Sequence, residues 1–111
     1  MRMTVSLELF KRRLEVELEA LRKEVIEHYG QVQPAIINDL HAINYSDWPD
    51  FLEQHFLLNH EPKLSRLIQL EAAIAQFEIG QYGYCADCEE AIELELLDND
   101  PATQRCKACS H

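Results

Sequence analysis

Cys85-Ala86-Asp87-Cys88 and, after seventeen intervening residues, Cys106-Lys107-Ala108-Cys109 are two CxxC motifs that together contain all four cysteines of this 111-residue chain. A CxxC turn places two thiolates on one edge of a tetrahedron, and Zn²⁺ prefers four such soft ligands in that geometry. The loop between the motifs is long enough to fold back, and no cysteine is left over. The spacing predicts one structural zinc ion, bound by Cys85, Cys88, Cys106 and Cys109.

Two other uses of paired cysteines stay open at this point. Two disulfides would suit a secreted domain, but no basic and apolar leader is recognisable ahead of Leu7. A thioredoxin-like redox pair needs a βαβ unit around one CxxC motif, and no such pattern surrounds either motif. No apolar run approaches the roughly 20 residues that span a bilayer. We therefore expect a cytoplasmic protein with reduced cysteines.

Charge is distributed unevenly along the chain. The formal net charge is −10, and six of the ten Lys and Arg residues lie within residues 1–23. Residues 24–62 contain no Lys or Arg and seven acidic residues: Glu24, Glu27, Asp39, Asp47, Asp50, Glu53 and Glu61. Because phosphate backbones repel such a chain, we expect no direct DNA binding through a general electrostatic surface.

The first helix is predicted over residues 5–29, where apolar residues recur at steps of three and four. This stripe consists of Leu7, Phe10, Leu14, Leu18, Leu21, Val25 and Tyr29. Gly30 and Pro34 then interrupt the helix, because proline lacks the backbone N–H and clashes with the preceding turn. We expect a kink or a brief break near Pro34 and a continuation over residues 35–43.

A polar turn at residues 44–50 is followed by the predicted second helix, which runs to Gly80 with a bend near Pro62. Ser46 or Asp47 can cap this helix, and Pro49 is compatible only with its first turn. Two long amphipathic helices joined by a short turn bury their apolar stripes against each other.

The predicted fold is therefore mainly α. Residues 1–80 form a long antiparallel helical hairpin with coiled-coil packing, and residues 81–111 form a small C4 zinc ribbon at its base. Residues 91–96 alternate apolar and acidic side chains, the period of a half-buried strand, and residues 98–101 read as a turn. The last CxxC motif is expected to open a final helical turn.

The C-terminal region resembles the DksA/TraR family of C4-type zinc-finger proteins. The resemblance rests on Gly80-Gln81-Tyr82-Gly83-Tyr84-Cys85, Cys88, Ile92, Leu97, Pro101, Cys106 and Cys109. It implies a transcription regulator that binds RNA polymerase, inserts its coiled coil into the secondary channel and presents an acidic tip near the active centre. It also implies that the four cysteines hold the zinc.

The tip motif of that family is Asp-x-x-Asp-x-Ala. Asp47-Trp48-Pro49-Asp50-Phe51-Leu52 keeps both aspartates at that spacing but has leucine in place of alanine. The resemblance makes Asp47, Trp48 and Asp50 candidate partner-binding residues. Capping and turn chemistry are the structural alternative for the two aspartates. Trp48 is expected to be exposed at the tip, with stapling of the turn onto Phe51 or Leu52 as the alternative.

Several positions depart from the family pattern. Glu89 occupies the place of the glycine that usually follows the first CxxC motif, so its backbone must avoid the left-handed region or accept strain. Glu95 and Leu96 replace an Arg pair, and Asp100 replaces another basic residue used to recognise ppGpp. Because a tetraphosphorylated nucleotide needs cationic partners, we expect a weak or absent ppGpp response.

Other functional classes have little support in the sequence. A nucleophile–base pair and a glycine-rich phosphate loop are not recognisable, and a metal with four thiolate ligands has no open position for water, so we expect no enzymatic activity. A zinc-ribbon adaptor that never reaches polymerase is the main alternative. A nucleic-acid-binding finger would need a basic face, yet residues 81–111 contain only Arg105 and Lys107. We expect the chain to be a monomer.

Overall fold

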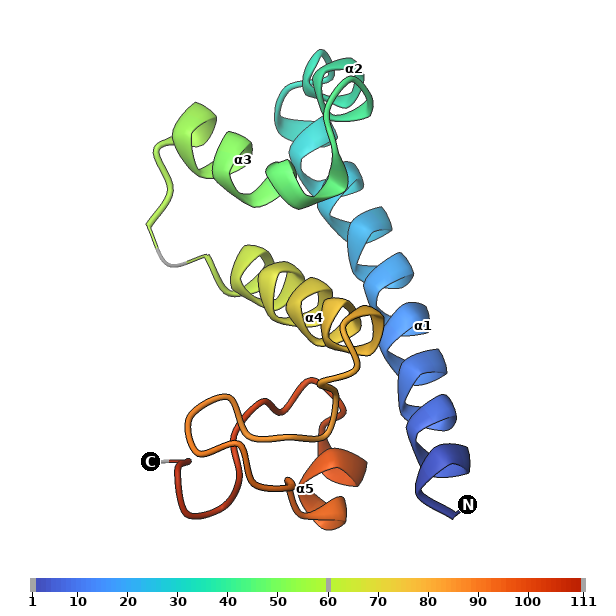
Figure 1. Ribbon diagram of the computed structural model, residues 1–111. Helices are drawn as coiled ribbons and strands as arrows, with labels where there is room; N and C mark the ends of the chain where they lie inside the picture. Colours follow the sequence, from blue (N-terminus) through green and yellow to red (C-terminus); the bar gives the residue numbers. More distant parts are fainter. Residues whose placement is uncertain (1, 60, 111) are drawn as a thin grey trace. The chain divides into compact units, whose positions relative to one another are not determined.

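The computed structural model describes residues 2–59 and 61–110 of the chain, and it is mainly helical (Figure 1). Its elements are α1 (Arg2–Val32), α2 (Ile36–His41), the 3₁₀ turn η1 (Tyr45–Asp47), α3 (Trp48–Phe56), α4 (Pro62–Glu78) and α5 (Leu94–Asn99). No strand occurs in these two described ranges. The predicted mainly α fold is thus confirmed.

The chain forms two compact units. One comprises Met1–Glu17 together with Ala72–His111, and the other comprises Leu18–Glu71. We call them the finger unit and the tip unit. The finger unit contains both CxxC motifs, and the tip unit contains the acidic turn.

Helix α1 buries the stripe that its sequence predicts. Its buried side chains recur at steps that keep them on one face; they are Phe10, Leu14, Leu18, Val25 and Tyr29. Helix α4 buries a matching set, Leu64, Leu67, Leu70 and Ala73. Apolar burial of this kind contributes most of the stability of such helices, because isolated helices are marginal in water.

Helix α1 packs against α4 in an antiparallel sense. In the tip unit, Arg22 pairs with Glu71 at 3.4 Å, and Glu24 pairs with Lys63 at 3.8 Å. In the finger unit, the ammonium of Lys11 lies 5.9 Å from the centre of the Phe77 ring. As the residue number increases along α1, the number of the contacting residue on α4 decreases. The two helices are therefore antiparallel, as in a helical hairpin.

The helices break near both prolines, which near Pro34 is one of the two expected outcomes. Residues 33–35 separate α1 from α2, and residues 57–61 separate α3 from α4. Helix α3 ends because Leu57 adopts a left-handed conformation, with φ of 55°, which is a common way to end a helix. Pro62 then begins α4, where its missing N–H costs nothing. The bend expected at Pro62 is thus a full interruption.

The strand predicted at residues 91–96 is wrong. The described part of the finger unit contains one isolated antiparallel bridge, between Tyr84 and Ala91, and then α5. A strand would place Ile92 and Leu94 on the same face, but Leu94 is 46% exposed while Ile92 is 3% exposed. The short helix instead buries Leu97 completely. The metal module is built from turns, a bridge and a helix.

A search of the described residues for a helix long and apolar enough to cross a bilayer finds none.

Candidate functional site

The four cysteines converge on one point in the finger unit. Their sulfur atoms all lie within 4.8 Å of one another, and the Sγ atoms of Cys88 and Cys106 are 3.6 Å apart. Zn–S bonds of about 2.3 Å in a tetrahedron separate the sulfurs by about 3.8 Å. All four cysteines are free thiols, so the disulfide alternative is not realised. The cluster fits one structural zinc ion, as predicted.

Electrostatics within the cluster also favour a cation. The backbone amides of Cys106 and Cys88 stabilise the thiolate of Cys85 and lower its pKa to about 6. Hydrogen bonds to the sulfurs of Cys106, Cys85 and Cys88 raise the pKa of Cys109 to about 12. The thiols therefore resist simultaneous ionisation by themselves, and Zn²⁺ supplies the positive charge that four adjacent thiolates need.

The first CxxC motif is closed by a strained backbone turn. The amide of Cys85 donates to the carbonyl of Glu90 at 2.7 Å, and the amide of Glu89 donates to the carbonyl of Cys85 at 3.0 Å. Making both bonds requires a sharp reversal, and Glu89 supplies it with φ of 64°. Glu89 could have avoided the left-handed region or accepted strain there, and the structure shows the strained conformation.

A carboxylate fixes the second CxxC motif. The amide of Lys107 donates to Oε1 of Glu93 at 3.0 Å, and this bond, with a smaller contribution from the lysine's charge, lowers the pKa of Glu93. Two further contacts join the first motif to the residues just before the second motif. The Arg105 guanidinium pairs with Asp87 at 2.9 Å, and the amide of Ala86 donates to the carbonyl of Gln104 at 2.8 Å. The strand predicted over residues 91–96 gives no sign that Glu93 lies beside the second motif.

An aromatic side chain attaches the metal module to the helices of the same unit. Tyr82 is buried and stacks on Phe77 of α4, with ring centres 3.9 Å apart and planes 15° apart. Its hydroxyl donates to the carbonyl of Pro101 at 2.6 Å. Burial raises the pKa of Tyr82 well above its usual value. Phe10 of α1 completes the group, 6.4 Å from the Tyr82 ring.

These features define residues 80–110 of the finger unit as a small structural C4 zinc finger, which we call the finger. Residues 80–111 match the model of the family described as prokaryotic dksA/traR C4-type zinc finger. This stretch of the chain is thus similar to the DksA/TraR zinc finger, as the motif predicted. Comparisons with curated proteins and with solved structures gave no match.

The tip unit presents two exposed aspartates around the start of α3. Asp47 occupies the N-cap position, yet its side chain makes no capping hydrogen bond to α3. Asp50 lies in the first turn of the helix, and both residues are exposed. Pro49 also lies in that first turn, as predicted. Position alone made Asp47 a plausible cap, but the geometry leaves its carboxylate available to solvent.

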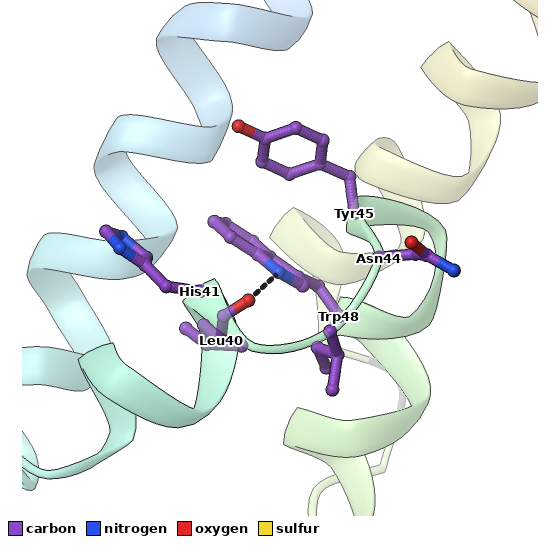
Figure 2. Close-up of a pocket in the computed structure, with 6 residues that line it drawn as sticks. Leu40, His41, Asn44, Tyr45 and Trp48 are labelled. Atoms are coloured by element: carbon purple, nitrogen blue, oxygen red, sulfur yellow. Dashed lines mark hydrogen bonds between the residues drawn. The ribbon is translucent and has the colours of Figure 1, made fainter.

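Trp48 does not match the expectation of an exposed indole. It is only 3% exposed, and its indole N–H donates to the carbonyl of Leu40 at 2.9 Å (Figure 2). The indole instead ties the start of α3 to the end of α2, and Tyr45 packs against it edge-on at 5.2 Å. Trp48 therefore supports the turn that carries the aspartates.

The positions that depart from the ppGpp-recognition pattern are acidic or apolar in the structure as well. Oδ1 of Asp100 accepts a hydrogen bond from the amide of Ala102 at 3.0 Å, which gives this carboxylate a turn-forming role. Glu95 is exposed on α5, and Leu96 is partly buried beside it. These three side chains offer no positive charge to a polyphosphate.

Proposed function

We propose that this chain is a bacterial transcription regulator that binds RNA polymerase through the secondary channel. The observation that carries the proposal is the family match of residues 80–111, because members of the DksA/TraR family act on RNA polymerase. The fold is compatible with it, since α1 and α4 form the antiparallel helices that such a role needs. We further propose a cytoplasmic, monomeric protein organised as a helical hairpin over residues 1–80 and a finger over residues 81–111.

In this proposal Asp47 and Asp50 are the residues that contact the polymerase. Their carboxylates are exposed at the start of α3, and that of Asp47 is not used as a cap. A pair of carboxylates on one turn attracts Mg²⁺ or basic channel walls. Trp48 belongs to the same binding element, where it holds the turn in place through its bond to Leu40.

The zinc ion has a structural role in this account. Four thiolates complete a tetrahedron, so the metal keeps no position for water or substrate. The ligands Cys85, Cys88, Cys106 and Cys109 hold the finger together, and Tyr82 attaches it to Phe77. The protein therefore acts by binding and not by catalysis.

We also propose that neither ppGpp nor DNA is a strong direct ligand. Glu95, Leu96 and Asp100 give a polyphosphate no cationic partner. On the finger, the guanidinium of Arg105 is paired with Asp87, which reduces its availability to a phosphate backbone. DNA binding that weakens steeply with salt would contradict this part of the proposal.

Co-purification with core RNA polymerase tests the proposal. The zinc-loaded chain is expected to be retained by immobilised core enzyme and to change the lifetime of open promoter complexes. The double variant Asp47→Asn/Asp50→Asn should lose the effect on open complexes. Glu15→Gln/Glu78→Gln removes the same charge from two other exposed helical positions and serves as the matched control. Absence of polymerase binding by the zinc-loaded chain would overturn the proposal.

A zinc-finger adaptor for another protein is the second candidate. It is favoured by one observation, the confinement of the family match to residues 80–111. An adaptor that uses only the finger would keep its activity in the Asp47→Asn/Asp50→Asn variant. The same pair of variants therefore separates the two candidates.

A further inference from the structure

The turn that carries Asp47 lies between two aromatic side chains of the tip unit. Asp47 follows Tyr45 and Ser46 and directly precedes Trp48. The Trp48 indole is fixed by its hydrogen bond to the carbonyl of Leu40. Because the Asp47 side chain makes no capping bond, its orientation depends on how the two aromatic neighbours hold the turn.

Burial does not fix the Tyr45 ring. The residue is 54% exposed, and its ring meets the Trp48 indole edge-on at 5.2 Å. Both side chains border a hollow of about 370 Å³ (Figure 2). The hollow is lined by Leu40, His41, Ile43, Asn44, Tyr45 and Trp48. A half-exposed ring beside open space keeps its rotamer freedom unless another group holds it.

Arg22 of α1 is the group that holds the Tyr45 ring. The central carbon of its guanidinium lies 3.8 Å from the ring centre, which is close to the van der Waals separation of two stacked planar groups. Glu71 of α4 pairs with the same guanidinium at 3.4 Å. The contact therefore joins α1 and α4 to the first residue of η1.

Hydrogen bonding does not account for the position of this guanidinium. Arginine carries five N–H donors, and the bond from Arg22 to Glu71, at 3.4 Å, is longer than a usual hydrogen bond. Nε of Arg22 is buried and has no hydrogen-bond partner among the described residues. Since an unpaired buried donor is costly, we attribute the position of Arg22 to its stacking on Tyr45.

The next cation along α1 has a different environment. Lys23 is exposed and pairs with Glu19 at 3.8 Å within the same helix. Residues 24–62 contain no Lys or Arg, so a cation that stacks on Tyr45 has to come from outside that range. Lys23 therefore provides a matched control for the loss of one positive charge from α1.

We propose that Arg22 and Tyr45 are positioning residues for Asp47. Arg22 holds the Tyr45 ring, the ring supports the Trp48 indole, and the turn between the two aromatic residues keeps Asp47 in one orientation. This inference rests on the proposed function, because it names the residues that orient the carboxylate offered to the partner. Neither Arg22 nor Tyr45 has to touch the partner for this role.

The single tryptophan of the chain permits a test without any partner. NMR measures solvent exchange of the Trp48 indole N–H in the full zinc-loaded chain. We expect exchange about fivefold faster in Arg22→Ala and in Tyr45→Leu, because each variant loses the cation–π contact. Tyr45→Phe keeps the ring and Lys23→Ala keeps the stack, so both should exchange as the parent does. Unchanged exchange in Arg22→Ala and Tyr45→Leu would overturn the inference.

The double variant Arg22→Ala/Tyr45→Leu separates positioning through the ring from a general loss of stability. If Arg22 acts through Tyr45, the double variant should exchange no faster than Tyr45→Leu, because the contact is already absent there. An effect equal to the product of the two single effects would contradict the proposal. Circular dichroism identifies a variant that fails to fold. If Arg22→Ala fails, Tyr45→Leu, with Tyr45→Phe as its conservative partner, carries the test.

The open-complex assay gives the functional result. Arg22→Ala and Tyr45→Leu should weaken the effect of the chain on open promoter complexes, and Tyr45→Phe and Lys23→Ala should keep it. If exchange accelerates but polymerase does not retain the parent chain, the positioning contact stands and the proposed function is lost. If polymerase is bound and the effect requires Asp47 and Asp50, but exchange is the same in all variants, only this inference is lost.

Discussion

Glu89 is a residue whose side chain does not suit its backbone conformation. With φ of 64° it lies in the left-handed region, which costs a non-glycine residue about 1–2 kcal/mol. Glycine relieves that strain but adds unfolded-state entropy. Glu89→Gly should therefore raise the free energy of unfolding by a net value of about 0.5–1 kcal/mol.

Chemical denaturation of the zinc-loaded protein measures this change. The control is Glu90→Gly, at a neighbouring position where φ is not positive, and there glycine should only destabilise. A Glu89→Gly variant that is less stable than the parent would show that the carboxylate has an essential contact.

Glu93 makes the finger sensitive to acid. Its pKa is lowered because its carboxylate accepts the amide of Lys107. A folded-state pKa below the unfolded value stabilises the fold above the ordinary carboxyl pKa of about 4.3, and this contribution is lost as pH falls through the lower folded value. Glu93→Gln should therefore be less stable than the parent at neutral pH, and the difference should shrink in acid.

Denaturation series from neutral pH to about pH 3, which is below the ordinary carboxyl pKa, check this prediction, with Glu95→Gln as the control for loss of an exposed carboxylate from α5. A difference between parent and Glu93→Gln that stays constant over the series would contradict the role of the charge. Zinc content is measured at each pH, because protonation of the thiolates also releases the metal.

At the scale of single residues, the metal-binding role of the cysteines was predictable from the sequence, and the buried position of Trp48 was not. Two CxxC motifs specify a metal site through spacing alone, because all the ligands come from two tight turns. The bond from Trp48 to Leu40 is a contact between the end of one helix and the start of another. Its existence depends on the path of residues 42–47, which no local pattern encodes.

At the scale of the elements, Tyr82 makes the packing contact between the finger and the helices α1 and α4. Tyr82→Phe removes the hydrogen bond to the carbonyl of Pro101 but keeps the stacking on Phe77. Since a buried carbonyl would lose its partner, we expect a loss of about 1–2 kcal/mol in the free energy of unfolding.

Tyr84→Phe is the matched control, since Tyr84 is 53% exposed, and it should change stability little. Denaturant unfolding measures the free energy of unfolding of both variants. Equal values for Tyr82→Phe and Tyr84→Phe would contradict this role of the Tyr82 hydroxyl. Loss of zinc from Tyr82→Phe at neutral pH would show that the hydrogen bond also holds the metal turns.

The long helices were more predictable from the sequence than the short helix α5. The stripe of α1 repeats over many turns, so its period is unambiguous. The six residues 91–96 fit an alternating pattern by composition, but α5 begins at Leu94 and buries Leu97. Six residues are too few to separate the two periods, and the metal turns on either side decide which one forms.

For the whole molecule, the account requires one zinc ion per chain and a finger that depends on it. Removal of zinc by a chelator should make all four thiols reactive, because the ligands are protected only while the metal holds them. Metal analysis and thiol titration before and after chelation measure this. The six-residue α5 is the helix that the finger contributes among the described residues, so helical circular dichroism should fall only slightly.

A chain that carries no zinc when purified, or whose four thiols react fully in its presence, would contradict the metal assignment. Collapse of the helical signal on chelation would show instead that α1 and α4 depend on the finger for their own stability.

Function was predictable from the sequence only as far as the finger. The cysteines and their neighbours specify the family model that residues 80–111 match. The tip motif is short and departs from the family at Leu52, so the roles of Asp47 and Asp50 rest on exposure and charge. The hollow lined by Leu40, His41, Ile43, Asn44, Tyr45 and Trp48 depends on how residues 40–48 fold together, and sequence patterns carry no sign of it.

The most direct measurement places a photoreactive p-benzoylphenylalanine at Ser46, an exposed residue of η1 between Tyr45 and Asp47. After irradiation of the complex with core RNA polymerase, mass spectrometry identifies the crosslinked peptides. The account predicts crosslinks to the walls of the secondary channel near the catalytic centre, and none there from the same group at Glu15. Crosslinks from Ser46 confined to the outer surface of the polymerase would contradict it.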